Sequence, residues 1–240
     1  MNALCLLMQK PEGRDVAYLL KNDDAVVLLL LVCFFVSALV FAKSKDYLLQ
    51  RLSDFFTTRD RTNLFPSGAQ SEAKNVFFLV IQFCVLAAFL LLVCVGERAK
   101  GEVSHTLWVQ LFVAYVLVWA LFLFLKWCLC LFLGWVFAFG EKVHIWTRSY
   151  TTLTYFLGLC LLPLGVVKVF VEVPTHWIVT TCLVLFIVFH LLLFYKMWQL
   201  FYKKNCGLLI ILYFCTLEIM PWYLVYLAIF EINTFVGLNF

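Results

Sequence analysis

Charge is scarce in this chain, and the scarcity decides its class. Only 13% of the 240 residues are Asp, Glu, Lys or Arg, whereas 65% are hydrophobic and the mean hydropathy is +1.00. A soluble domain of this length needs a charged, hydrated exterior, which so few charges could not supply. The composition therefore predicts an integral membrane protein. The net charge of +4 is too small to favour a nucleic-acid partner.

Sequence motifs of the common catalytic classes are absent as well. The chain has no HExxH, no GxSxG, no P-loop and no glycine-rich dinucleotide motif. Most of its ten cysteines lie in or beside apolar runs, and Cys128 and Cys130 have neither the spacing nor the second pair of a zinc site. Only one histidine, His190, falls within the hydrocarbon, which leaves a bis-histidine haem without a second ligand. We therefore expect no cofactor, no metal and no enzymatic activity.

The apolar runs predict an all-α, polytopic transmembrane bundle of about six helices. A helix needs about 20 apolar residues to cross a hydrocarbon core of about 30 Å. Five runs are plain, at residues 25–42, 75–95, 151–171, 177–195 and 207–230. We expect residues 1–24 to stay outside as an N-terminal segment without a cleaved leader, and residues 25–240 to form a single domain.

The remaining run, residues 107–139, has an ambiguous length. Its 33 residues contain a single charge, Lys126, and as a helix would measure about 50 Å. That length is too great for one upright span and too small for two. We place the span at 106–125 and expect 127–139 to be a helical continuation that emerges or turns at the interface. The competing hypothesis is one strongly tilted helix, and a seventh crossing is the least favoured.

Basic residues are divided unevenly between alternate loops. The loops at 43–75, 126–150 and 196–206 hold twelve Lys and Arg, whereas the other loops and the N-terminal segment hold six. The positive-inside rule therefore places the first set in the cytoplasm and both termini outside.

The cations and tryptophans that border the runs are expected to lie at the membrane interfaces. Long basic side chains can extend from a helix to the headgroups. We expect this of Lys126, Arg148 and Lys196 on the cytoplasmic side and of Lys168 on the outer side. Trp222 is expected in an interfacial belt, whereas Trp119 falls in the middle of a span and is expected to pack between helices.

The connection 43–75 contains an amphipathic segment. Residues 46–56 place five apolar side chains at helical spacing on one face: Leu48, Leu49, Leu52, Phe55 and Phe56. Two hypotheses fit this pattern. The segment is either an amphipathic helix on the cytoplasmic membrane surface or a cytoplasmic extension of the first span that packs on the bundle.

Glu218 is the most unusual residue of the chain. It lies eleven residues into the last run, about 16 Å from the helix entry and so near the middle of the membrane. A carboxylate there must be protonated, paired or directed at a polar cavity. Pro221, one turn away, frees a backbone carbonyl beside it. Glu218 is therefore either functional or a packing residue that hydrogen-bonds a neighbouring helix.

His190 is the second intramembrane candidate. It lies about 9 Å from the cytoplasmic face, which brings it within reach of Glu218. The two residues could relay a proton or could form an interhelical hydrogen bond, and the hydrogen bond is favoured. Gln82 and Thr216 are weaker members of the same polar cluster. Pro163 is expected to kink the fourth span, and because the first span has no proline, an inverted-repeat transporter is disfavoured.

The end of the chain resembles a known family. Residues 212–221, Leu-Tyr-Phe-Cys-Thr-Leu-Glu-Ile-Met-Pro, follow a Tyr-Lys-Met-Trp segment at 195–198 and are similar to the ending of an uncharacterised family of small polytopic inner-membrane proteins of Bacteroidota. That family is a domain of unknown function with a Leu-Glu-Ile-x-Pro motif, matched here by Glu218 and Pro221. Phe55-Phe56 and Gly134-Trp135 support the resemblance, which would cover about residues 25–230. It implies a bacterial inner-membrane protein without a defined activity or substrate.

These observations lead to one functional hypothesis and two rivals. The favoured hypothesis is a non-enzymatic subunit or assembly factor of an envelope complex, in protein export or cell-envelope biogenesis. Its expected partners are the lipid bilayer and one or more inner-membrane proteins. One rival is a small proton- or ion-coupled transporter that uses Glu218. The other is a lipid-modifying membrane enzyme.

Overall fold

The computed structural model describes residues 24–56, 69–96, 105–137, 140–171, 173–201 and 207–235. Side chains are described over 24–53, 55–56, 74–96, 107–132, 145–171, 173–199 and 219–235. These residues form six helices and no strand: α1 (Asp24–Phe56), α2 (Ala69–Gly96), α3 (His105–Phe137), α4 (Gly140–Phe170), α5 (Thr175–Phe201) and α6 (Gly207–Phe235).

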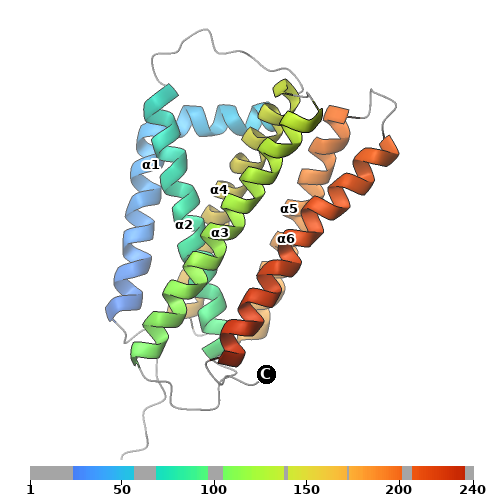
Figure 1. The fold of residues 1–240 in the computed structure, drawn as a ribbon. Coiled ribbons are helices and arrows are strands. Elements are labelled where there is room, and N and C mark those ends of the chain that lie inside the picture. The colour runs from blue at the N-terminus through green and yellow to red at the C-terminus, as the bar shows by residue number, and fades with distance from the viewer. Residues whose placement is uncertain are drawn as a thin grey trace, which may run out of the picture.

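The helices form an up-and-down bundle (Figure 1). α1 begins and α6 ends at its lower end in that view, whereas α2, α4 and α6 begin at its upper end. Within the described residues, five helices are long and apolar enough to cross a membrane, and the apolar stretch Ile219–Phe235 of α6 is shorter. The prediction of an all-helical membrane bundle is confirmed.

Helix α2 is the centre of the bundle. In the most apolar part of α2, 61% of the residues are buried, compared with 17% in each of α1, α3 and α5. α2 packs closely against α4 at Gly158, where a Cβ atom would lie only 2.9 Å from Cβ of Phe83. Small residues at such crossings let helix backbones approach each other in membranes. The most buried surface of the protein therefore lies between α2 and α4.

Helix α3 runs without a break through the position where we expected the span to end. It is 33 residues long, and Figure 1 shows it inclined relative to α1. A turn after residue 125 is therefore not present, and residues 127–137 are a helical continuation, which fits both the emerging helix that we expected and the competing hypothesis of one inclined helix. The physical reason is that no proline or glycine interrupts residues 107–133, so each residue adds a backbone hydrogen bond.

Helix α1 bends at Ser44, whose backbone is not helical (φ −134°, ψ 20°). The part after the bend, residues 45–56, crosses the upper end of the bundle (Figure 1) and is called the crossing segment below. The buried Ser44 hydroxyl accepts a hydrogen bond of 2.6 Å from Nδ2 of Asn75 on α2. Neither predicted kink interrupts its helix, since α4 continues through Pro163 and α6 through Pro221.

The crossing segment packs on the bundle through two of its five apolar residues. Leu48 is fully buried against Val40, Val76, Leu79 and Tyr155, and Phe55 is buried among Tyr150, Leu153, Phe189 and Leu193. Leu49 and Phe56, in contrast, are about half exposed, at 49% and 52%. The segment therefore has an inner face that contacts α2, α4 and α5 and an outer face that the protein leaves open.

Candidate functional site

Gln82 belongs to a polar contact between α1 and α2. Its Nε2 atom donates to Oγ of Ser37 at 2.7 Å, and that hydroxyl donates to the carbonyl of Cys33 at 3.0 Å. Oε1 of Gln82 is buried without a hydrogen-bond partner. Gln82 therefore faces α1, whereas the contacts described for His190 are on α5 and α6. The structure does not bring these two predicted site residues together within the described side chains.

His190 lies at the contact between α5 and α6. Its Nδ1 atom is 3.0 Å from the carbonyl oxygen of Phe186. A carbonyl only accepts, so Nδ1 carries a proton and donates it. The imidazole also lies 4.1 Å from the Phe186 ring and 5.5 Å from the Trp222 ring, between centroids.

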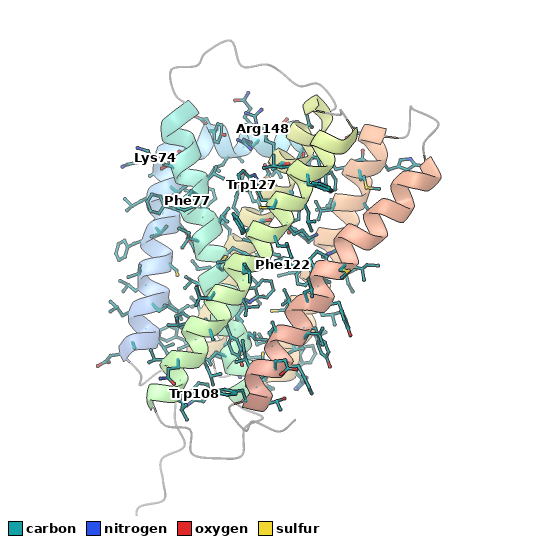
Figure 2. The ribbon with its side chains drawn as sticks, in the orientation of Figure 1. Lys74, Phe77, Trp108, Phe122, Trp127 and Arg148 are labelled. Carbon is teal, nitrogen blue, oxygen red and sulfur yellow. The ribbon has the colours of Figure 1, made fainter. Side chains whose placement is uncertain are left out.

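Trp222 is the centre of an aromatic cluster that joins α3, α5 and α6. Its ring centroid lies 4.6 Å from Phe122, 4.5 Å from Phe186 and 5.8 Å from Trp119. Phe122 lies between the two ends of the bundle in Figure 2, with Arg148 above it and Trp108 below it. The contacts with Phe186 and Trp119 are edge-to-face, and such contacts add about 0.5–1.5 kcal/mol each to the burial of the rings. Trp222 thus packs between helices, contrary to our expectation of an interfacial position, while Trp119 packs as expected.

Three lysines that we expected to reach the headgroups are buried in the protein. Lys196 is 1% exposed, Lys126 4% and Lys168 6%. Nζ of Lys196 donates to the carbonyl oxygen of Phe55 at 2.5 Å and lies 5.4 Å from the Phe55 ring centroid. It therefore holds the end of the crossing segment on α5. The prediction failed because protein groups cover these three side chains, and for Lys196 and Lys168 they also supply acceptors that headgroups would otherwise supply.

The other two lysines have different surroundings. Lys168 donates to the carbonyl of Val173 at 3.1 Å and to Oγ1 of Thr175 at 2.7 Å, where α4 connects to α5. Nζ of Lys126 lies over two rings, 5.8 Å from the centroid of Phe122 and 5.1 Å from that of Tyr150. Cation–π attraction of this kind is strongest where water is excluded.

The side chains of Glu218 and Thr216 lie outside the described residues, although both positions belong to α6. Their predicted roles therefore stay predictions. Pro221 is fully buried and Pro163 is exposed. Among the side chains that the structure describes, no group of three His, Cys, Asp or Glu could hold a metal ion.

The sequence analysis did not predict that Lys126 is buried beside two aromatic rings. A signal was present, because Lys126 lies inside an unbroken apolar run rather than at its border. A cation flanked by apolar residues on both sides is better placed for burial than a cation beside a loop. The same run contains Trp119 and Phe122, whose rings contact Trp222.

The helices, their apolar surface and the buried polar contacts define a polytopic α-helical membrane protein. A family model described as "Domain of unknown function (DUF4271)" matches residues 26–229, so the chain belongs to this family. This confirms the expectation of an uncharacterised family over about residues 25–230. No curated protein and no solved structure matches the chain.

Proposed function

We propose that the protein is a non-enzymatic subunit or assembly factor of an envelope complex in a bacterial inner membrane, in protein export or cell-envelope biogenesis. The observation that carries the proposal is the crossing segment. Its inner face is held on the bundle by Leu48, Phe55 and the Lys196 bond, and its outer face leaves Leu49 and Phe56 open. A helix that is already ordered loses little entropy when a partner binds.

The proposal assigns the upper end of the bundle to the cytoplasm. The twelve-to-six distribution of Lys and Arg supports this orientation, because the twelve belong to the connections that follow α1, α3 and α5, and these helices end at the upper end of the bundle (Figure 1). The outer face of the crossing segment also carries Lys45, Asp46 and Gln50, which are exposed. A mixed apolar and charged face suits a protein partner at the membrane surface better than the lipid interior does.

The experiment is affinity purification of the tagged protein, expressed at its native level and extracted in mild detergent. We expect a near-stoichiometric partner that is lost from the variant Leu49→Ala/Phe56→Ala. The matched control is Leu191→Ala/Phe230→Ala, which removes side chains of the same kind and similar exposure from α5 and α6. Its partner should be retained. A lone protein, or a partner that both double variants retain, would contradict the proposal.

The second candidate is proton- or ion-coupled transport through Glu218. The supporting observation is that two titratable side chains, the half-buried His190 and the buried Lys126, lie around the aromatic cluster of α3, α5 and α6. This function requires Glu218 to exchange a proton. Full complementation of a deletion strain by a stably produced Glu218→Gln variant would eliminate it, whereas loss of function with normal protein level would favour it.

A further inference from the structure

The hydrogen bond between Ser44 and Asn75 brings exposed lysines of two helices to the same level. Lys43 is the last residue of α1 before the bend, and Lys74 directly precedes Asn75 on α2. Both lysine side chains are exposed. Neighbouring Cα atoms are about 3.8 Å apart, so each lysine lies a single residue from this 2.6 Å bond. The bond therefore fixes the spacing of two cations that belong to different helices.

Positive charge dominates this part of the upper end. The structure describes four charged side chains within two residues of the bond: Lys43, Lys45, Asp46 and Lys74. Three cations against one anion give a net charge of +2. Asp46 adjoins Lys45 on the crossing segment and offsets its charge, whereas Lys43 and Lys74 have no acid beside them among these side chains. A basic cluster where helices leave the membrane attracts anionic lipid headgroups.

On α2, Lys74 lies at the upper end of an exposed apolar stripe. Positions three, four and seven residues further along a helix share its face. Here they are Phe77, Phe78 and Ile81, which are 62%, 52% and 44% exposed. Figure 2 shows Lys74 above Phe77. Val76, in contrast, is buried in the core of the bundle. The stripe therefore offers apolar surface to lipid chains directly below a cation.

Helix α1 repeats this arrangement below Lys43. Leu39 and Phe35 lie four and eight residues before the lysine on the same broad face, and they are 58% and 56% exposed. The adjacent Val40 is buried in one cluster with Val76 of α2, so the two helices meet through other faces. A phospholipid has the same order of groups, with its charge at the headgroup and its apolar chains below.

We propose that Lys43 and Lys74 bind the headgroup of an anionic phospholipid, whose acyl chains lie along the two stripes. The phosphate is negatively charged and accepts hydrogen bonds from both ammonium groups. A zwitterionic lipid has the same chains, but its own cation competes with the lysines for the phosphate. The site lies outside the crossing segment. The inference goes beyond the proposed function, because it holds whether or not a protein partner binds.

The test is native mass spectrometry of the full chain in detergent, titrated with one added lipid at a time. We expect dioleoyl phosphatidylglycerol to bind about 25-fold more tightly than dioleoyl phosphatidylcholine, at about fivefold for each lysine. Lys43→Gln/Lys74→Gln should lower this ratio to below about five, whereas Lys43→Arg/Lys74→Arg should keep it. The matched control is Lys203→Gln/Lys204→Gln, which removes two charges between α5 and α6 and should also keep the ratio.

Equal affinity of the parent for the two lipids overturns the proposal, and so does an unchanged ratio in Lys43→Gln/Lys74→Gln. An equal fall in the control variant also overturns it, because the preference would then follow from net charge alone. Glycerol 3-phosphate separates a lipid from a soluble phosphate, since it has the phosphate without acyl chains. We expect it not to bind at lipid concentrations that saturate the protein, and binding as tight as that of phosphatidylglycerol would exclude a lipid as the occupant.

Discussion

The two ends of the bundle bury lysines in different ways. At the lower end, Lys168 bonds to Val173 and Thr175, which follow it in the sequence by five and seven residues. At the upper end, Lys196 bonds to the carbonyl of Phe55, 141 residues away. The first lysine stabilises a local turn between consecutive helices, whereas the second joins distant parts of the chain. A buried lysine therefore stabilises local structure at the lower end and tertiary structure at the upper end.

The largest effect in this comparison should come from truncating the inner face of the crossing segment. Phe55→Ala removes a ring that is 2% exposed and packed against α4 and α5, and it should lower the free energy of unfolding by about 3 kcal/mol. The adjacent Phe56→Ala, at an exposed position, is the control and should cost less than about 1 kcal/mol. Equal losses in denaturant titrations would show that the crossing segment does not depend on its inner face.

Substitution of each lysine by methionine tests whether the two ends of the bundle differ in this way. Lys196→Met should cost about 1.5–3 kcal/mol, the usual value of a hydrogen bond to a charged group. Hydrogen exchange measured by mass spectrometry should then rise over residues 45–56, far from the substitution in the sequence. Lys168→Met should raise exchange only around residues 168–175. Faster exchange of the crossing segment in the Lys168 variant would remove the distinction between the two ends.

The smallest effect is expected for the hydrogen bond between α3 and α6 near the lower end. Tyr115→Phe keeps the buried ring and removes the hydroxyl that donates to Asn233. Interhelical hydrogen bonds in membrane proteins contribute about 0.6 kcal/mol on average, so the melting temperature should fall by only about 1–3 °C. A fall comparable to that of Lys196→Met would mean that the lower end holds the bundle as firmly as the upper end.

The spans could be predicted from the sequence because they depend on each segment alone. An apolar run of sufficient length must form a helix in lipid, whatever its neighbours are. For the same reason α3 continues through residue 125 without a turn, since nothing in it stops the helix before its last residues. Length and hydropathy therefore predict the helices, but they do not say how far each helix is inclined.

The site could not be predicted to the same degree because it depends on contacts between helices. The bend at Ser44 involves no glycine or proline and coincides with a hydrogen bond from Asn75, on another helix. The burial of Lys196 depends on Phe55, and the position of Trp222 depends on Phe122 and Phe186. Hydropathy assigns a charged side chain to the interface by its place in the run, and it contains no information about which helix covers that place.

The bond between Lys196 and Phe55 also constrains the order of events during synthesis. A chain grows at about 5–20 residues per second, so a span of 141 residues takes about 7–28 s. Throughout that interval Phe55 has been synthesised while its lysine has not yet been made. The crossing segment can therefore reach its final position on the bundle only after α5 has entered the membrane, when five of the six helices are in place.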